Sequence, residues 1–320
     1  MDADRGAELV RQLALAEGFQ QCGIARADFL AEEAPKLEQW LKLGYQGRMK
    51  YLENHFDERL DPRKLVTGAR SVISLLYDYR PKKDIEPVSG LKIARYAYGE
   101  DYHVVIKEKL RKLAERMKEQ IGDFDGRVFV DSAPVMERQW ARRAGLGWLG
   151  KNGLLLNQHR GSYFFLAEII CDLDLSPDAP VADRCGTCTA CVDACPTQAI
   201  VQSGVVDSNR CISYLTIELK GSIPDEFHGR MDNWIFGCDV CQEVCPWNRF
   251  SQPNTEPRFE PTGEWPSFSA SEWTELTESV FRKNFKGSAV KRAGFAGLVR
   301  NIGAASGQKA QDQNTLEVKS

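Results

Sequence analysis

The sequence has no stretch of about 18 apolar residues, which excludes a membrane-spanning helix. Its first residues, MDADRGAELVRQ, lack the basic start and the apolar run of a secretory signal, so we expect a cytoplasmic protein without a membrane partner. Histidine is scarce, with four residues, and leaves no obvious histidine-based metal site. The net charge of −3 does not indicate a nucleic-acid binder, although local basic patches matter more than the total.

Hydrophobic residues make up 42% and charged residues 27% of the 320, as in globular proteins, and this length suggests two domains or one domain with a smaller module. Residue patterns predict helices over 3–17, 32–43, 47–55, 103–120 and 134–145, and strands over 22–27, 71–77, 127–131, 154–156 and 163–170. This alternation indicates one α/β-type domain over 1–175. We expect a cysteine-rich domain over 176–250, a basic segment over 251–305 that packs on the core, and a disordered tail over 306–320.

Cysteine is the informative residue, because eight of the ten lie between positions 185 and 245. The first run has the spacing C-x2-C-x2-C-x3-C-P of bacterial ferredoxins, in which the fourth cysteine ligates the other cluster. The second run lacks its first member, and Cys211 is the replacement upstream. Exchanging the fourth ligands predicts one four-iron cluster on Cys185, Cys188, Cys191 and Cys245, and another on Cys195, Cys211, Cys238 and Cys241.

Two zinc sites are the alternative, because C-x2-C pairs also bind zinc. The three-cysteine spacing and the prolines that follow both runs favour iron–sulfur clusters. Cys22 and Cys171 lie in predicted strands and are interpreted as small core residues. Since such clusters carry electrons one at a time, a reaction centre is expected in the larger domain.

Two motifs in that domain are incomplete. Gly145, Gly147 and Gly150 fit G-x-G-x-x-G, but a helix precedes them and a strand follows, the reverse of a dinucleotide fingerprint. Asp101-Tyr-His103 resembles the start of the cobalamin motif D-x-H-x-x-G, but Ile106 replaces the glycine. His103 is therefore interpreted as a helix cap or a surface residue.

Asp131 ends a predicted strand, where an acid can face a pocket, and partial burial there would raise its pKa towards a value suited to proton donation. From its position alone, an Asx turn or a helix cap is the commoner role. Glu137 and the arginines of the next helix are interpreted as solvated or paired. Residues 281–300 hold six basic residues and no acid, which suggests a phosphate backbone as a partner, while a solvated surface is the alternative.

Several segments together resemble the epoxyqueuosine reductase family, from about residue 8 to 300. They are VDSAPVMERQWARRAGLGWLGKN, GSYFFLAEI, CGTCTACVDACPTQAI, RCISYLTIE and GCDVCQEVCPWN. The resemblance implies an α+β fold, with an α/β cobalamin-binding domain of nitroreductase-like type before a bacterial ferredoxin-like domain with two clusters. It also implies reduction of epoxyqueuosine to queuosine at the wobble position of tRNA, by cobalamin and two 4Fe-4S clusters. No histidine of the protein would ligate the cobalt.

The resemblance also assigns residues. Asp131 matches the family's proton donor, which replaces the turn or cap interpretation. Positions that match the lining of the corrin or its tail are Arg59, Ala94, Asp131, Leu155, Leu166, Ser213, Cys238 and Asp239. Lys220 falls where a tRNA contact is expected, and we add Arg282, Lys283 and Lys286 from the basic stretch. Longer family members carry C-terminal helical repeats that this chain lacks.

Three other functions are considered. A pure electron-transfer module would not need 175 residues before its clusters. A cobalamin-dependent reductive dehalogenase-like enzyme acting on a small molecule would be expected to carry a twin-arginine leader. A nucleic-acid-binding protein could use the clusters structurally, and a bound corrin would separate it from the enzymes. We expect a monomer that receives electrons from a low-potential donor of ferredoxin or flavodoxin type.

Overall fold

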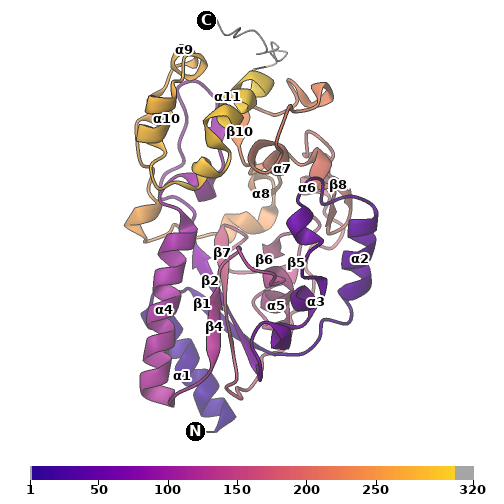
Figure 1. The fold of residues 1–320 in the computed structure, drawn as a ribbon, viewed down its shortest axis with the longest axis vertical. Coiled ribbons are helices and arrows are strands. Elements are labelled where there is room, and N and C mark those ends of the chain that lie inside the picture. Colours follow the sequence, from indigo (N-terminus) through magenta and orange to yellow (C-terminus); the bar gives the residue numbers. More distant parts are fainter. Residues whose placement is uncertain (1, 307–320) are drawn as a thin grey trace, which may run out of the picture.

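The computed structural model describes residues 2–306, so the predicted tail over 307–320 lies outside the described residues. A four-stranded sheet of order β1-β2-β7-β4 forms the lower half of the molecule (Figure 1). Its strands are β1 (Gln21–Arg26), β2 (Ser71–Asp78), β7 (Phe164–Cys171) and β4 (Gly126–Phe129). All three pairings are antiparallel, so the alternation of strands and helices along the chain does not produce a parallel sheet.

Alternate residues of the strands supply two apolar cores, one on each face of the sheet. On one face, α1 (Ala3–Ala16) and α4 (Tyr102–Ile121) pack on residues such as Ile73 and Ile169. On the other face, α5 (Glu137–Arg143) buries Trp140 against the strands. Figure 1 shows α1 and α4 on one side of the sheet, and α2 (Ala34–Lys42), α3 (Phe56–Leu60) and α5 on the other.

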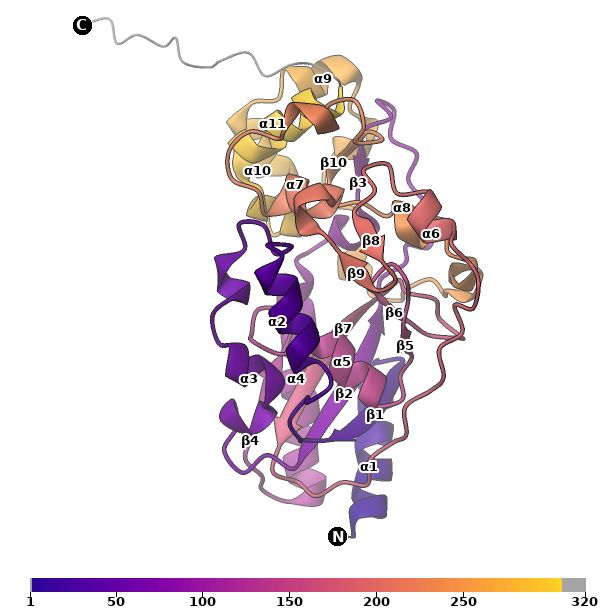
Figure 2. The ribbon, with the colours of Figure 1, turned by 90° about the vertical axis from the view of Figure 1, so that its right-hand side faces the viewer.

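A second body, here called the cap lobe, consists of residues 91–98, 212–240 and 265–305 around one apolar core. Its short strand β3 (Lys92–Ile93) pairs in parallel with β10 (Trp234–Phe236), as Figure 2 shows above the sheet. Its helices are α7 (Ile212–Ile217), α9 (Ala270–Thr274), α10 (Glu278–Asn284) and α11 (Gly294–Ala305). The predicted domains 1–175 and 251–305 therefore share a core in three dimensions.

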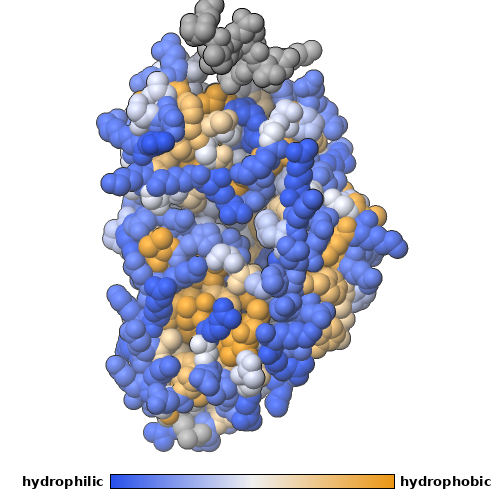
Figure 3. Space-filling model, viewed as in Figure 1, coloured by the Kyte–Doolittle hydropathy of each residue, from blue (hydrophilic) through white to orange (hydrophobic). Residues whose placement is uncertain are grey.

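The cysteine runs lie beside both bodies. They include α6 (Ala190–Asp193), the hairpin of β8 (Ile200–Gln202) and β9 (Val205–Val206), and α8 (Val240–Glu243). A hairpin of β5 (Trp148–Leu149) and β6 (Leu155–Leu156) links them to the sheet. On the face in Figure 3, hydrophilic side chains predominate, and apolar ones gather at the lower centre. No helix within residues 2–306 has the length and apolar character needed to cross a membrane.

Three sequence predictions differ from the structure. The helix predicted over 47–55 is only a 3-10 turn at Lys50–Leu52, and the backbone is left-handed at both ends of the range, with φ of 61° at Gly47 and 58° at His55. The strand predicted over 127–131 ends at Phe129, and Asp131 has a φ of 53°. The helix predicted over 134–145 begins only at Glu137.

The glycine-rich segment belongs to a hairpin, since β5 lies between Gly147 and Gly150 and β6 follows. A Cβ atom at Gly147 would lie 2.2 Å from the carbonyl oxygen of Leu156, so close strand packing requires a glycine there.

Candidate cluster and active sites

The structure gathers the eight clustered cysteines into two groups of four. Burial is the main cause that raises the pKa of the Cys191 thiol, and the nearby thiols of Cys245, Cys185 and Cys188 raise it further. In the second group, burial raises the pKa of Cys241 most, and Cys211 and Cys195 contribute. Cys238 lies near both Cys241 and Cys211. Each group therefore contains the four cysteines that the sequence predicts as the ligands of one cluster.

The two groups differ in exposure. In the first group, which we call the outer group, Cys188 is exposed, and a cavity of about 210 Å³ is lined by Cys185, Cys188, Cys191 and Cys245. The indole nitrogen of Trp148 donates to the sulfur of Cys185 at 3.4 Å. In the second, inner group, Cys211 and Cys238 pack against the core of the cap lobe. Cys191 of the outer group also influences Cys241, so the two groups are neighbours.

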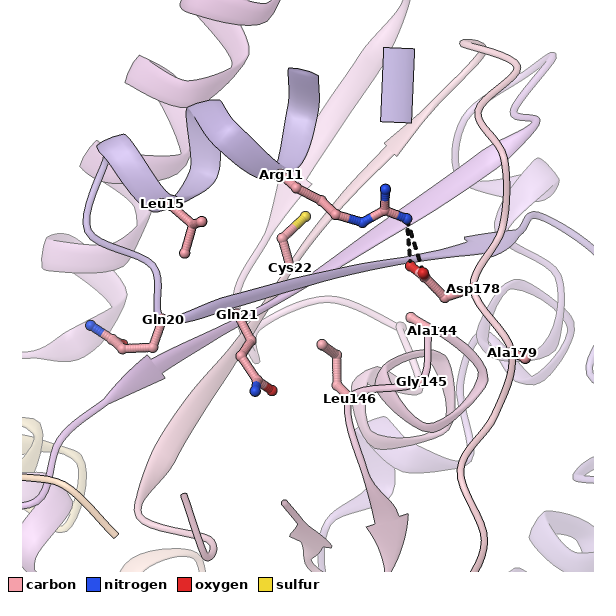
Figure 4. Close-up of a pocket in the computed structure, with 10 residues that line it drawn as sticks. All are labelled: Arg11, Leu15, Gln20, Gln21, Cys22, Ala144, Gly145, Leu146, Asp178 and Ala179. Carbon is pink, nitrogen blue, oxygen red and sulfur yellow. Dashed lines mark hydrogen bonds and ion pairs between the residues drawn. The ribbon is translucent and has the colours of Figure 1, made fainter. Parts of the chain in front are cut away.

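Cys22 and Cys171 lie outside these groups, in β1 and β7. Cys171 is fully buried, and burial raises the pKa of both thiols to about 12. Cys22 lines a cavity of about 410 Å³ that contains none of the predicted site residues. Figure 4 shows Arg11 reaching across this cavity to Asp178, with a nitrogen–oxygen distance of 2.9 Å.

Asp131 lies on the loop between β4 and α5, and its side chain is 61% exposed. The Tyr102 hydroxyl donates to its Oδ2 at 2.9 Å, and Nε2 of His103 lies 3.3 Å from the same oxygen. Burial tends to raise the pKa of Asp131, but the hydrogen bonds from His103 and Tyr102 outweigh it and lower the pKa. The expectation that burial raises this pKa is therefore wrong, because two donors stabilise the carboxylate.

His103 has a different place from the one predicted. Asp101 is the N-cap of α4, and its Oδ1 also lies 2.8 Å from Nδ1 of His103. Burial tends to lower the pKa of His103, but Asp101 and Asp131 raise it to about 9. The imidazole therefore carries a proton at neutral pH and is held between two carboxylates. The sequence did not indicate this, since Asp131 follows 28 residues later in the chain.

Two more acids lie behind Asp131, and sequence reasoning assigned them no role. The backbone N–H of Asp131 donates to Oε1 of Glu137. Glu137 contacts Glu168, which is completely buried at the middle of β7. An acid inside the apolar segment YFFLAEII was the signal in the sequence that could have indicated Glu168.

The predicted corrin-lining residues come from both bodies. Leu155 is buried on β6, and Leu166 is the one partly exposed residue of β7. Asp239 is buried, and its Oδ2 accepts hydrogen bonds from the backbone and the side chain of Arg95 at 2.9 and 3.1 Å. Burial raises the pKa of Asp239 to about 6. The hydrogen bonds from Arg95 therefore hold the Asp239 carboxylate in a fixed position.

The remaining corrin-lining predictions also have defined places. Ala94 is buried beside β3, Ser213 is partly exposed on α7, and Cys238 belongs to the inner group. The Arg59 side chain donates to the Tyr51 carbonyl oxygen at 2.9 Å. Asp131 and Asp239 lie close enough to the Tyr96 hydroxyl to add to the effect of burial, which raises the pKa of that hydroxyl. The proton-bearing groups and the inner cysteine group thus lie around one region between the two bodies.

Three of the six basic residues in the stretch over 281–300 form ion pairs. Arg282 pairs with Glu278 at 2.6 Å, Lys283 with Glu264 at 3.3 Å, and Arg292 with Glu218. The acids come from outside the stretch, so the structure neutralises about half of the charge imbalance that the sequence shows. Within residues 2–306, Lys286 has no ion pair.

Other basic side chains of this region bind backbone oxygens. Arg300 donates to the carbonyl oxygens of Leu215, Leu219 and Gly221. Lys220 is exposed, with its Nζ atom 3.4 Å from the carbonyl oxygen of Arg292.

Two neighbouring groups of four thiols and a cluster of charged side chains on an α+β body are the features of a two-cluster iron–sulfur oxidoreductase. Residues 184–248 match the family described as 4Fe-4S double cluster binding domain, and residues 59–132 match the family described as Epoxyqueuosine reductase QueG, DUF1730. The first match identifies two 4Fe-4S clusters, rather than zinc, as the metal centres.

The chain is 58% identical over 301 residues to the epoxyqueuosine reductase of Cyclobacterium marinum, covering 93% of this chain and 96% of that protein. A crystal structure of epoxyqueuosine reductase with an epoxyqueuosine-modified tRNA-Tyr stem loop has a TM-score of 0.85 and 33% identity, covering 93% and 80%. The enzyme from Bacillus subtilis, with its catalytic aspartate loop swung out of the active site, has a TM-score of 0.84 and 32% identity, with the same coverage. The chain belongs to the epoxyqueuosine reductase family and is an oxidoreductase.

Proposed function

We propose that this chain reduces epoxyqueuosine in tRNA to queuosine, with cobalamin as cofactor and Asp131 as the proton donor. The reaction removes the epoxide oxygen as water, which consumes two electrons and two protons. The observation that carries the proposal is the contact of Asp131 with a protonated His103, near the inner cysteine group. The family membership and the tRNA stem loop bound by a relative support tRNA as the substrate.

The outer and inner cysteine groups are assigned as ligands of the two clusters. Corrin binding is assigned to the apolar surface of Leu155 and Leu166, with Arg59, Ala94, Ser213, Cys238 and Asp239 around it. A flat macrocycle with polar edges would suit this set, which combines apolar strand residues with polar side chains. When bound, cobalamin supplies a low-valent cobalt that gives electrons to the strained epoxide.

The residues of this chain would supply the proton. Because the pKa of Asp131 is low and that of His103 is about 9, the proton resides on the imidazole at neutral pH. As charge develops on the departing oxygen, the proton on Nε2 of His103 would pass to the Asp131 carboxylate, and Asp131 would deliver it to that oxygen. Tyr102 holds the same carboxylate oxygen in place. Such a positioned acid contributes about 10²–10⁴ in rate.

Asp131→Asn tests this role, because the amide keeps the shape but cannot donate a carboxylic proton. We expect single-turnover reduction of epoxyqueuosine tRNA to slow by about 10² or more. Iron content, corrin binding, tRNA binding and cobalt reduction by a strong reductant should not change. A residue that only forms a turn would instead cost about 1 kcal/mol of stability and leave the rate close to normal. That second result would reject the acid role.

We assign the outer group as the entry point for electrons from a low-potential donor of ferredoxin or flavodoxin type. Cys188 is exposed, and Arg184, Arg249 and Lys151 line the same cavity. These three cations suit an acidic donor protein. We assign Lys220, Arg282, Lys283 and Lys286 as contacts to the tRNA backbone, and Lys286 as the strongest of the last three because it has no ion pair within residues 2–306.

A further inference from the structure

Glu168 is a buried acid that takes no part in cluster binding or in the proposed proton transfer. It lies on β7 between Ser74 of β2 and Phe129 of β4, with no exposed surface. Within residues 2–306, neither of its carboxyl oxygens has a hydrogen-bond donor. An ionised carboxylate in such a place is very costly, so Glu168 keeps its proton.

Glu137 connects this buried acid to the catalytic loop. Its carboxyl group contacts that of Glu168, and two carboxyl groups bond to each other only when one is protonated. Oε1 of Glu137 accepts the backbone N–H of Asp131. Glu137 therefore accepts two hydrogen bonds, one from the protonated carboxyl group of Glu168 and one from the backbone N–H of Asp131.

The neighbouring charged residues determine which of the three carboxyl groups, those of Asp131, Glu137 and Glu168, are ionised. The charged groups that face the two glutamates are Asp131 on the loop and Arg138 on α5. From α4, His103 and Tyr102 reach the Asp131 carboxylate. Strands β2 and β4 present Ser74 and Phe129, which do not titrate in this range. His103, Arg138 and Arg292 are the cations near Asp131 and Glu137, and His103 also pairs with Asp101 and Arg292 with Glu218. Glu168 has no cation of its own among these groups, so its carboxyl group is the neutral one.

We propose that Glu137 and protonated Glu168 are positioning residues that hold the catalytic loop in place. Asp131 needs such support because a φ of 53° is uncommon in residues other than glycine, even though aspartate adopts it more often than most. Glu137 fixes the Asp131 amide, and Glu168 prevents Glu137 from turning towards water. The proposed consequence for catalysis rests on the proton-donor role of Asp131, whereas the holding of the loop does not.

Hydrogen exchange of the fully loaded enzyme, read by mass spectrometry over 130–136, tests the inference without an activity assay. Glu168→Met removes the donor to Glu137 at nearly constant volume, and we expect exchange in this segment to become at least tenfold faster. Glu168→Gln keeps a donor and should protect the segment as the wild type does. Glu33→Gln is the matched control, because Glu33 is a buried acid paired with Arg142 of the same helix, α5.

Turnover provides the second readout. Glu168→Met should lower it by about tenfold or more, while Glu168→Gln restores it. The pKa of Glu137 is raised to about 8, chiefly by burial and then by Asp131, so wild-type turnover should decline as the pair loses its proton above that pH. In Glu168→Gln, this decline should move up towards pH 9, where His103 titrates.

The outcomes separate the two proposals. Equal exchange over 130–136 in wild type and Glu168→Met would overturn the positioning role, whatever the activities are. Faster exchange with unchanged turnover would support the holding of the loop and reject the proton-donor role of Asp131. If Glu168→Met does not fold, Glu137→Met removes the acceptor of the Asp131 amide at a half-buried position, and the same exchange result is expected.

Discussion

The cluster region and the proton-donor pocket encode their chemistry in different ways. Seven of the eight cluster cysteines fall in two short runs, 185–195 and 238–245, whose spacing alone indicates a metal centre. The pocket joins Tyr102 and His103 of α4, Asp131 of a loop, Glu137 of α5 and Glu168 of β7. Local spacing therefore predicts the electron-carrying part, whereas the proton-carrying part depends on how the sheet brings distant segments together.

The strongest test of this contrast removes one ligand from each cysteine group. Cys241→Ser should lose the inner cluster, and Cys188→Ser should weaken or lose the outer one. Iron analysis of anaerobically reconstituted protein should give about eight iron atoms in wild type and about four after loss of one cluster. Turnover should fall below detection in Cys241→Ser. Eight iron atoms in this variant would contradict the ligand assignment.

Substitutions around Asp131 should slow turnover to different degrees, and His103→Gln should give an intermediate rate. The amide still donates a hydrogen bond but stores no proton, so turnover at pH 7 should fall by about tenfold, less than for Asp131→Asn. Because the folded-state pKa of about 9 exceeds the ordinary 6.5, the pair stabilises the fold fully below pH 6.5 and loses this contribution as the pH rises through 9. The pH dependence of thermal unfolding should lose that alkaline step in the variant.

Charge reversal at the outer group tests where electrons enter. Arg184→Glu with Arg249→Glu should raise the KM for a ferredoxin- or flavodoxin-type donor several-fold. Reduction by a small chemical reductant should stay the same, because no docking is involved. Arg111→Glu, at an exposed position of α4, is the matched control. An equal response in both variants would place the docking surface elsewhere.

The basic stretch should give a smaller effect than its sequence suggests. Lys286→Gln should flatten the salt dependence of tRNA binding by about 0.7–0.9 log units if that residue contacts one phosphate. Arg282→Gln should change the slope less, because its partner Glu278 already neutralises it. Equal slopes in all three proteins would leave Lys220 as the residue to test.

The smallest expected effect comes from the two cysteines outside the groups. Cys22→Ser and Cys171→Ser should leave the iron content unchanged. Cys171→Ser should still lower the free energy of unfolding by about 1–3 kcal/mol, because a hydroxyl replaces a fully buried thiol in β7. Thermal unfolding and iron analysis of the same samples check both statements.

Much of the fold followed from the sequence, because long apolar patterns such as those of α4, β2 and β7 fix their own structure. The segment around 47–55 did not, since its shape depends on a distant contact: the backbone N–H of Arg48 donates to the Tyr214 hydroxyl. Asp131 was assigned by family resemblance, and its lowered pKa depends on donors from α4 that no local pattern shows.

The core of the cap lobe has a consequence for how the protein is made. The side chain of Asn301 in α11 donates to the carbonyl oxygens of Thr216 and Ile235, at 2.8 Å each. Leu298 and Ile302 of the same helix belong to the core that supports Cys211 and Cys238. A nascent chain has all eight cysteines long before this helix leaves the ribosome. Stable insertion of the inner cluster must therefore wait until α11 has emerged, and the newly made thiols need protection from oxygen until then.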